Sequence, residues 1–301
     1  MKIRVGIVGY GNLGKAIEKE AKERDQFDLV GIFSKRNVEG TIPVDMVEDY
    51  KDKIDLLFLC GGSQNELEKQ AFRFIKNFNI VESYDNHNRL KDFHMQLGKE
   101  AKQSGKIALC SFGWDPGLFS LMRGLFDAVG YKPYTFWGKG LSQGHTQAIK
   151  NISGVEDAVQ FTVPNSEIVK QICDGKDVEI SKDFHRRECF VVCKKDQRER
   201  IEHEIVTMPD YFDGYKTSVK FVTQNQLEKI KNFAHQGRVI AKNRTMEFSL
   251  KLPSNPEFTA KVAVCFARAF KHLQRDKNAG VFTIFDLPFS YIIGENKYLY
   301  L

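Results

Sequence analysis

The sequence predicts an α/β fold in which a doubly wound parallel sheet is followed by a second domain of mixed α+β structure. In the first third of the chain, short apolar runs alternate with amphipathic helical patterns, which is typical of parallel sheets covered by helices. After residue 117 the expected strands become longer and their apolar and polar residues alternate, as in antiparallel sheets. A chain of 301 residues is long enough for two domains.

The first domain is expected to span residues 1–117. Apolar runs predict its strands at residues 3–8, 28–33, 54–60, 80–81 and 106–111. Helical spacing predicts its helices at residues 13–21, 67–78 and 89–103. In the first of these helices Leu13, Ile17 and Ala21 lie four residues apart, so they share one face.

The second domain is expected to span residues 118–274, and the segment 275–301 is expected to return to the first domain. Alternation predicts antiparallel strands at residues 134–137, 188–193, 215–223 and 246–252. Helices are expected at residues 118–129, 198–207 and 258–274.

The charge balance raises the question of nucleic acid. The 45 Lys and Arg residues exceed the 39 Asp and Glu residues, which gives a formal net charge of +6. The basic residues are interspersed with acidic ones, and no basic run carries the interleaved aromatics of a nucleic-acid groove. The longest apolar run, residues 56–60, is far shorter than the roughly 18 residues of a membrane span. We therefore expect neither nucleic acid nor a membrane as a partner.

The cysteines predict a reducing compartment. The six of them are scattered without C-x-x-C or histidine-spaced patterns, which indicates neither a disulfide framework nor a metal site. The first residues enter a strand directly and lack the apolar region and cleavage site of a secretory signal. A cytoplasmic protein with reduced cysteines and no metal is expected.

A glycine-rich turn follows the first predicted strand and opens the first predicted helix. Its sequence is Gly9-Tyr10-Gly11-Asn12-Leu13-Gly14, which matches G-x-G-x-x-G. In this context the glycines permit a tight turn and a close approach of the backbone to a pyrophosphate at the helix N-terminus. The pattern predicts a Rossmann dinucleotide-binding domain; the alternative is a purely structural turn.

The end of the second strand indicates which dinucleotide binds. An Asp or Glu there would bond the ribose 2′-hydroxyl of NAD, but the chain has Ser34-Lys35-Arg36. A hydroxyl and two cations favour a 2′-phosphate, so NADP is the predicted cofactor. Two solvated basic residues are the alternative.

Another glycine pair ends the strand at residues 54–60. The segment Cys60-Gly61-Gly62-Ser63 is expected to approach the nucleotide, because cofactors lie along this edge of the sheet. Ser63 can also cap the helix that follows.

Two further strand ends carry carboxylates. They are Ser83-Tyr84-Asp85-Asn86-His87 and Ser111-Phe112-Gly113-Trp114-Asp115-Pro116-Gly117. Both loops are expected to face the nicotinamide. The cofactor-contacting residues expected here are Ser83, Tyr84, Asp85, Phe112, Gly113, Trp114, Asp115 and Pro116. Two carboxylates in successive loops suggest a pocket for an ammonium group, although each can equally be a turn residue.

Several motifs together resemble the meso-diaminopimelate dehydrogenase family. They are Gly9-Tyr10-Gly11-Asn12-Leu13-Gly14, Gly113-Trp114-Asp115-Pro116-Gly117, the run from Phe136 to His145, Arg187-Glu188-Cys189-Phe190-Val191-Val192 and Thr207-Met208-Pro209-Asp210-Tyr211-Phe212. The resemblance extends from the first strand to about residue 290. The tryptophan-containing motifs are typical of that family rather than of Rossmann proteins in general.

The resemblance implies a homodimeric, NADP-dependent amino-acid dehydrogenase of lysine and diaminopimelate biosynthesis. It also implies that the second domain binds the substrate and forms the dimer. Its reaction would be reversible oxidative deamination of the D-configured centre of meso-2,6-diaminopimelate. The products would be L-2-amino-6-oxopimelate, in equilibrium with tetrahydrodipicolinate, together with ammonia and NADPH.

Matching motif to motif assigns site residues. Asp85 and Asp115 resemble the residues near the reacting amino group, in a catalytic role. Trp114, Trp137, Gln143 and Gly144 resemble residues that line the same pocket. Thr162, Arg187, His235 and Asn255 resemble positions that hold the substrate, and the first three would surround its distal carboxylate. The loop at His235 departs from the family pattern, because it lacks a proline and one glycine.

Residue chemistry alone leaves alternatives open. Arg187 is a planar fork suited to a carboxylate, or it forms an ordinary ion pair with a neighbour such as Glu188. His235 donates to a carboxylate or is merely exposed. Rival functions are an imine reductase of the dihydrodipicolinate reductase type, which the absence of an adjacent His-His pair disfavours, and a non-catalytic NADP sensor.

Overall fold

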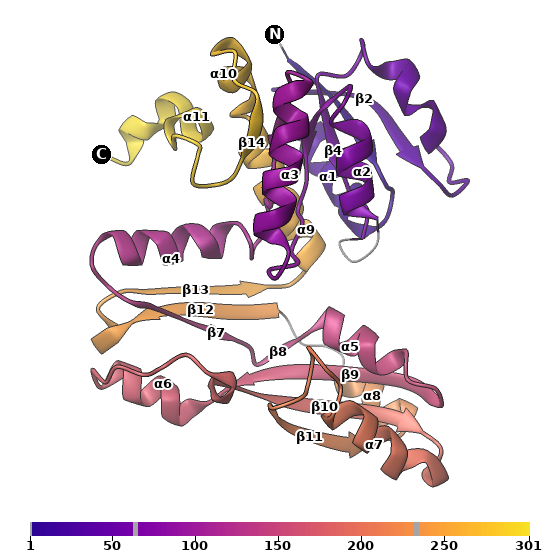
Figure 1. Ribbon diagram of the computed structural model, residues 1–301, viewed down its shortest axis with the longest axis vertical. Helices are drawn as coiled ribbons and strands as arrows, with labels where there is room; N and C mark the ends of the chain where they lie inside the picture. Colours follow the sequence, from indigo (N-terminus) through magenta and orange to yellow (C-terminus); the bar gives the residue numbers. More distant parts are fainter. Residues whose placement is uncertain (1, 63–65, 231–234) are drawn as a thin grey trace. The chain divides into compact units, whose positions relative to one another are not determined.

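The computed structural model describes residues 2–62, 66–230 and 235–301 (Figure 1). The chain divides into two compact units. Unit 1 consists of Met1–Leu121 and Asn255–Leu301, and unit 2 consists of Met122–Ser254. The helix α4 (Leu118–Ala128) begins in the first and ends in the second. Among the described residues, no helix combines the length and apolar character needed to cross a bilayer.

Unit 1 is built on a parallel sheet. Its described strands are β1 (Ile3–Val8), β2 (Phe27–Ser34), β3 (Ile42–Pro43), β4 (Leu56–Leu59), β5 (Asn79–Val81), β6 (Ile107–Leu109) and β14 (Gly280–Phe282). They are ordered β14-β6-β5-β4-β1-β2-β3, and all their pairings are parallel. The chain leaves β1 toward β2 and later returns on its other side with β4. The direction of winding therefore reverses between β1 and β4, where sheets of this kind bind ligands at their carboxyl edge.

Two apolar cores cover the faces of this sheet. On one face α1 (Asn12–Lys22) and α9 (Asn255–Ala267) pack together with α10 (Phe270–Arg275). On the other face lie α2 (Leu67–Phe74), α3 (Leu90–Gln103) and the 3-10 helix η1 (Val44–Tyr50). The tail adds α11 (Ser290–Ile293) and the 3-10 helix η5 (Gly294–Leu299). The predicted α/β fold with a doubly wound parallel sheet is confirmed.

The boundary expected at residue 274 is wrong. The predicted helix at residues 258–274 is two helices, α9 and α10, and both belong to unit 1. The reason is the close packing of α9 against α1, where small side chains of α9 such as Ala260, Ala263 and Ala267 are buried. Unit 2 therefore ends at Ser254, and β14 joins the sheet beside β6.

Unit 2 contains two smaller sheets. One has the order β11-β10-β9-β8, formed by β8 (Gly140–Leu141), β9 (Val155–Pro164), β10 (His185–Cys193) and β11 (Lys216–Phe221). The other has the order β13-β12-β7, formed by β7 (Pro133–Trp137), β12 (His235–Ala241) and β13 (Glu247–Leu252). The helices are α5 (Gln143–Lys150), α6 (Ser166–Cys173), α7 (Arg198–Val206) and α8 (Gln224–Ile230), with 3-10 turns at Lys182–Phe184, Lys195–Gln197 and Lys242–Arg244. This unit is the mixed α+β domain that the sequence predicts.

One pairing in unit 2 corrects the expectation of antiparallel strands. β10 and β11 are parallel, whereas β10 pairs antiparallel with β9 and β12 pairs antiparallel with β7 and β13. The helix α7 lies between β10 and β11 in the chain, and such a crossover returns the second strand in the direction of the first. β9 and β12 were not among the predicted strands.

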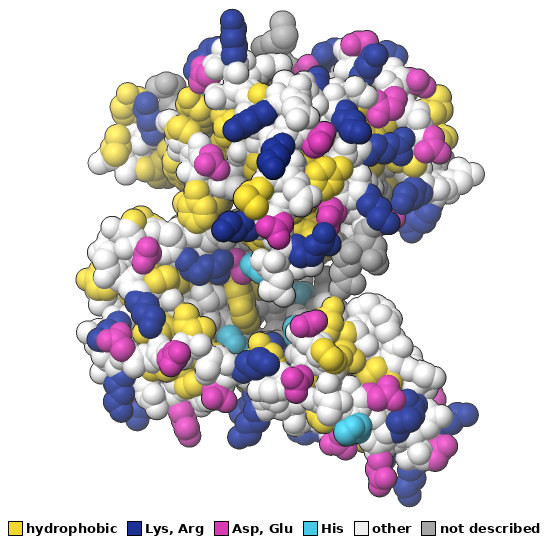
Figure 2. Space-filling model, viewed as in Figure 1, with side chains coloured by type: hydrophobic (Ala, Val, Ile, Leu, Met, Phe, Trp, Pro, Cys, Tyr) yellow, Lys and Arg dark blue, Asp and Glu magenta, His cyan; other side chains and the backbone are white. Residues whose placement is uncertain are grey.

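The charges on the surface are mixed. On the face drawn in Figure 2, basic and acidic side chains are intermingled over each unit. This distribution agrees with the interspersed charges of the sequence and with its modest net charge of +6.

Candidate cofactor and substrate sites

The glycine turn lies between β1 and α1, at the point where the sheet reverses its winding. Gly9 has φ +99°, and its N–H donates to the carbonyl of Phe33 at 2.8 Å. A Cβ on Gly14 would lie 2.1 Å from the carbonyl oxygen of Gly9, so the helix reaches the turn only without a side chain there. A Cβ on Gly11 would meet no atom within 4 Å. The turn therefore leaves room above Gly11, at the positive end of α1, which suits a pyrophosphate.

The residues between these glycines support the turn. Tyr10 and Leu13 pack against the core on the α1 face, and the hydroxyl of Tyr10 donates to Glu18. Asn12 is the first residue of α1, so its backbone belongs to the helix N-terminus.

The end of β2 places two cations beside this turn. Ser34 is buried, and its Oγ accepts from the N–H of Arg36 at 3.0 Å. The guanidinium of Arg36 donates to the carbonyl of Tyr10 at 3.1 Å. Lys35 pairs with Glu66 at 2.7 Å, which lowers the pKa of that carboxyl. Both cations are thus held at the edge where the ribose of a dinucleotide would lie.

The second glycine pair lies next to the first turn. The N–H of Cys60 donates to the carbonyl of Val8 at 2.7 Å, and a Cβ on Gly9 would lie 2.9 Å from the carbonyl oxygen of Cys60. A Cβ on Gly61 would approach Gln70 to 2.6 Å, whereas one on Gly62 would meet nothing within 4 Å. Ser63 lies outside the described residues.

The loops that follow β5 and β6 approach each other. Asp85 is exposed, whereas the side chain of Asp115 is only 8% exposed. His87, from the first loop, places its Nε2 at 3.8 Å from Oδ2 of Asp115 in the second. The structure thus joins the two loops that the sequence predicted to carry carboxylates. His87 was not predicted as a site residue, and its place in the same loop as Asp85 was the available signal.

Buried residues anchor both loops. Tyr84, Phe112 and Gly113 are buried, and Ser83 is partly buried. Trp114 packs edge-on against Phe119, with ring centroids 5.6 Å apart, and the Asp115-Pro116 peptide bond is cis.

The start of α9 lies against the loop that carries Asp115. A Cβ on Gly113 would lie 3.7 Å from Cγ2 of Thr259, a buried residue of this helix. The hydroxyl of Thr259 in turn donates to Oδ1 of Asn255 at 3.2 Å. Asn255 therefore belongs to unit 1, together with the two carboxylate loops.

The centre of the candidate substrate site in unit 2 is Arg187. Its residue is 9% exposed, and its Nη1 donates to Oγ1 of Thr162 at 2.6 Å across the β9–β10 pair. Its guanidinium lies 4.3 Å from the ring centroid of Tyr215, an attractive cation–π distance. Within the described part of the chain it forms no ion pair, and its buried Nε has no hydrogen-bond partner. A buried cation with neutral partners is a strong candidate for binding an anion.

The charge of Arg187 changes the pKa of two neighbouring histidines. Burial and the repulsion of the Arg187 cation lower the pKa of His145 to about 4 and that of His185 to about 4. Both imidazoles are therefore neutral at pH 7. Burial also lowers the pKa of Arg187 itself.

Other predicted residues of unit 2 gather around the same strands. Nε2 of His185 accepts from the N–H of Trp137 at 2.8 Å, and a Cβ on Gly138 would collide with the backbone of Thr162. His235 opens β12, the strand that pairs with β7 near Trp137, and burial lowers its pKa. Gly144 lies in the first turn of α5. The side chain of Gln143 is outside the described part of the structure.

The sequence did not single out four neighbours of Arg187. They are His145, Gln160, His185 and Tyr215. Gln160 is fully buried, its Nε2 lies 3.5 Å from Oγ1 of Thr162, and its Oε1 has no partner among the described residues. The signal for it was available, because Gln160 and Thr162 are polar residues two apart within the apolar second half of β9 and so share a face.

These features define a class of protein. Unit 1 has a Rossmann-type sheet with a glycine turn and two carboxylate loops. Unit 2 has a buried cation that forms no ion pair with the described residues. Together these are features of a two-domain nicotinamide-dependent dehydrogenase. A family model described as the diaminopimelic acid dehydrogenase C-terminal domain matches residues 113–256.

Known relatives give the particular family. The meso-diaminopimelate D-dehydrogenase of Ureibacillus thermosphaericus is 43% identical, over 96% of this chain and 94% of that enzyme. The structure of the Corynebacterium glutamicum DAP dehydrogenase in complex with DAP matches with a TM-score of 0.90 and 38% identity, over 98% and 97% of the two chains. An engineered D-amino acid dehydrogenase bound to NADP+ matches with a TM-score of 0.85 and 37% identity, over 98% and 97%. This chain belongs to the diaminopimelate dehydrogenase family.

Proposed function

We propose that this protein catalyses the reversible, NADP-dependent oxidative deamination of the D-configured centre of meso-2,6-diaminopimelate. The products are L-2-amino-6-oxopimelate, which cyclises to tetrahydrodipicolinate, ammonia and NADPH. In reverse, the reaction serves diaminopimelate and lysine biosynthesis. The observation that carries the proposal is Arg187, a buried guanidinium without a carboxylate partner among the described residues. A substrate with a carboxylate at each end supplies that partner.

The cofactor site of unit 1 suits NADP. Gly9, Gly11 and Gly14 give the pyrophosphate access to the backbone, and Cys60, Gly61 and Gly62 border the same edge. Ser34, Lys35 and Arg36 supply a hydroxyl and two cations for the 2′-phosphate, and Lys35 would leave Glu66 to reach it. When bound, the cofactor accepts the hydride, and the protein supplies orientation and charge.

The proposed reaction proceeds through an iminium ion on the substrate. The C–H bond at the D-centre breaks, its electron pair leaves with the hydride, and the carbon–nitrogen bond becomes double. Water then adds to that carbon, a proton is transferred to nitrogen, and ammonia leaves as the carbonyl forms. These steps need a group that orients the amine and a group that accepts protons.

The two carboxylates of unit 1 are assigned to these roles. Asp115 is nearly enclosed and lies 3.8 Å from His87, whereas Asp85 is exposed. We assign orientation of the amine and proton transfer to the two carboxylates, Asp85 and Asp115. The other predicted site residues of unit 1 lie in the same two loops or at the start of α9; they are Ser83, Tyr84, Phe112, Gly113, Trp114, Pro116 and Asn255.

The distal end of the substrate is assigned to unit 2. Arg187 and Thr162 are assigned to its carboxylate, with His235 as a further donor. Trp137, Gln143 and Gly144 are assigned to the same substrate site by their place in the family motifs. Stereoselectivity follows from holding both ends, because only one orientation then presents the D-hydrogen to the cofactor.

A direct assay tests this proposal. Purified protein is incubated with NADP and with meso-, LL- or DD-diaminopimelate, and NADPH absorbance is followed. Turnover confined to the meso isomer supports the proposal, and no turnover with any isomer overturns it. NADP binding without turnover would favour the sensor function instead.

We also propose that the protein is a cytoplasmic homodimer. Large apolar side chains are exposed in unit 2, among them Leu125 at 46%, Val129 at 53% and Ile180 at 65%, and a second copy would cover such surface. All six cysteines are free thiols, which suits a reducing compartment. Light scattering during size-exclusion chromatography tests the oligomer, and a monomeric mass would contradict it.

A further inference from the structure

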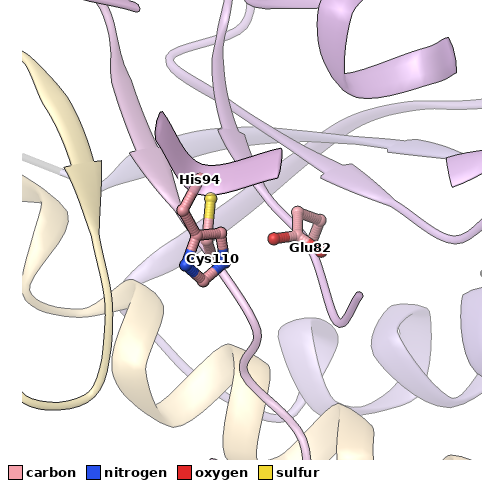
Figure 3. Close-up of side chains that lie close together, drawn as sticks. All are labelled: Glu82, His94 and Cys110. Atoms are coloured by element: carbon pink, nitrogen blue, oxygen red, sulfur yellow. The ribbon is translucent and has the colours of Figure 1, made fainter. Parts of the chain in front are cut away.

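Glu82 is a buried carboxylate at the end of β5 that the proposed reaction does not use. Its residue is 2% exposed. Figure 3 shows it close to His94 of α3 and to Cys110, which follows β6, with one ligating atom from each of the three within 4.8 Å of the others. Burying a carboxylate is unfavourable, so its hydrogen bonds must offset the loss of water.

The oxygens of Glu82 reach both carboxylate loops. One oxygen accepts from the N–H of Tyr84, the residue before Asp85. The other accepts from the N–H of Ser111 at 3.0 Å, at the start of the segment that leads to Asp115. The thiol of Cys110 donates to the same carboxylate. A single side chain thus ties together the backbones of the two loops.

Backbone hydrogen bonds of Glu82 reinforce this connection. Its N–H donates to the carbonyl of Leu109 at 2.9 Å, and its carbonyl accepts from the N–H of Phe112 at 3.0 Å. The main chain and the side chain of one residue therefore both hold the end of β6.

Ser111 adopts a conformation that needs such support. Its φ is +62°, in the left-handed region, which costs a residue other than glycine about 1–2 kcal/mol. Its Oγ lies 3.0 Å from Nε2 of His94, and its N–H is held by Glu82. Backbone strain of this kind persists where surrounding contacts hold it, and it clusters at functional sites.

We propose that Glu82 is a positioning residue that fixes the loops of Asp85 and Asp115 relative to each other for hydride and proton transfer. The inference rests on the proposed function, because it gives Glu82 its role in that reaction. The carboxylate acts as a two-sided acceptor between strands β5 and β6. It does not touch the substrate in this role.

The cluster is better explained by hydrogen bonds than by a metal ion. Both oxygens of Glu82 already accept from backbone N–H groups, and a cation would compete for them. Burial and the nearby carboxylate raise the pKa of the Cys110 thiol well above its ordinary value, so the thiol stays protonated and acts as a donor. Thiolate, not thiol, is the form that binds metals.

The test compares Glu82→Gln with Glu82→Asp. The amide of glutamine turns an N–H₂ group toward one of the two backbone donors, whereas aspartate keeps two accepting oxygens. We expect Glu82→Gln to lower kcat about 10- to 100-fold, as small misplacements of reacting groups do. KM for diaminopimelate and Kd for NADP should change less than about threefold, because neither contacts Glu82, and Glu82→Asp should recover most of kcat.

Glu68→Gln is the matched control. An oxygen of Glu68 lies 3.4 Å from the hydroxyl of Tyr84, and Glu68 pairs with Arg89. It is therefore an acid in the same region whose partners in these two contacts are side chains. It should keep kcat within about twofold. Circular dichroism checks that every variant folds.

Hydrogen exchange supplies a readout that does not depend on turnover. Amides at residues 83–87 and 111–117 should exchange faster in Glu82→Gln and recover in Glu82→Asp. Unchanged exchange and kcat in Glu82→Gln, or aspartate no better than glutamine, would overturn the inference. So would stoichiometric zinc in the purified protein whose removal abolishes activity. If the wild type fails to turn over diaminopimelate, the proposed function falls, and the exchange data still decide whether Glu82 holds the loops.

Discussion

Each unit contains a buried charged side chain, and the two differ in how their hydrogen bonds are satisfied. Glu82 in unit 1 is 2% exposed, and both its oxygens accept from backbone N–H groups. Arg187 in unit 2 is 9% exposed, donates to Thr162, and keeps an Nε without a partner among the described residues. A buried charge satisfied by its own fold stabilises a conformation, whereas one with an unused donor can bind a ligand.

The two sites also differ in the pKa values of their ionisable groups. Burial raises the pKa of Glu82 to about 7, against the hydrogen bonds that lower it. Around Arg187, burial and the cation lower the pKa of His145 to about 4 and keep its ring neutral. In the described part of unit 2, Arg187 contacts the neutral side chains of Thr162 and Tyr215, so a substrate carboxylate would meet no competing anion from them.

The largest expected effect concerns the carboxylates that Glu82 positions. Asp115→Asn keeps the shape of the side chain and removes its charge and proton acceptor. We expect kcat to fall about 10²- to 10⁴-fold, the range typical of a lost acid or base. Steady-state kinetics with meso-diaminopimelate measures it. Asp92→Asn, on the exposed side of α3, is the control and should retain full activity. A full-rate Asp115→Asn enzyme would remove this residue from catalysis.

The next effect tests the unused donor of Arg187. Arg187→Gln should raise KM for diaminopimelate and lower kcat/KM about 10- to 100-fold, because a hydrogen bond to a charged group contributes about 1.5–3 kcal/mol. NADP binding should not change. Arg186→Gln is the matched control, since Arg186 is the preceding residue, is exposed and pairs with Glu188. Equal effects of the two substitutions would mean that burial without an ion pair does not mark the substrate site.

A smaller effect is expected at the end of β2. Replacing Lys35 and Arg36 together by Glu should raise KM for NADP about 10-fold or more and reduce preference over NAD, because two cations become anions beside a 2′-phosphate. Lys170→Glu with Lys176→Glu changes the net charge equally on the surface of unit 2 and should leave both values unchanged. An unaltered KM for NADP in the first variant would exclude these residues from phosphate binding.

The sequence predicts unit 1 better than unit 2 for a physical reason. The strands of a buried parallel sheet are continuous apolar runs, and the glycine turn depends on residues within a six-residue segment, so both are local signals. The pairing of β10 with β11 was wrong because direction depends on the α7 crossover, although that helix itself was predicted. The boundary near residue 254 depends on how α9 packs against α1, which is a contact between distant parts of the chain.

The candidate sites show the same limit. Arg187 was assigned from a resemblance, because the residue type alone does not distinguish a surface pair with Glu188 from a buried anion site. The structure makes that distinction through burial and hydrogen bonds. Glu82 was not predicted as a site residue, because a single acidic residue at the end of a short strand forms no recognisable local pattern. Its role depends on Ser111, 29 residues away.

The smallest expected effect is on the pH dependence of stability, to which Glu82 in unit 1 and His145 beside Arg187 in unit 2 contribute with opposite signs. The pKa of His145 is lower in the folded protein than in the unfolded chain, so the unfolded chain takes up a proton first as the pH falls. The folded protein should therefore lose stability between about pH 6.5 and pH 4. The loss is about 1–2 kcal/mol at pH 5. Glu82 has the opposite sign: its raised pKa means that stability increases as pH falls from about 7 toward its unfolded value of about 4.5.

Thermal unfolding between pH 7 and pH 5 distinguishes these contributions. His145→Gln should make the midpoint temperature less sensitive to acid by a few degrees, since about 1 kcal/mol corresponds to a few degrees in a chain of this size. Glu82→Gln should make it more sensitive, because it removes the group that gains stability on protonation. His203→Gln, at an exposed position of α7, should leave the pH dependence unchanged. If both variants shift the pH dependence in the same direction, the contrast between a hydrogen-bonded carboxyl group in unit 1 and a cation with neutral neighbours in unit 2 does not hold.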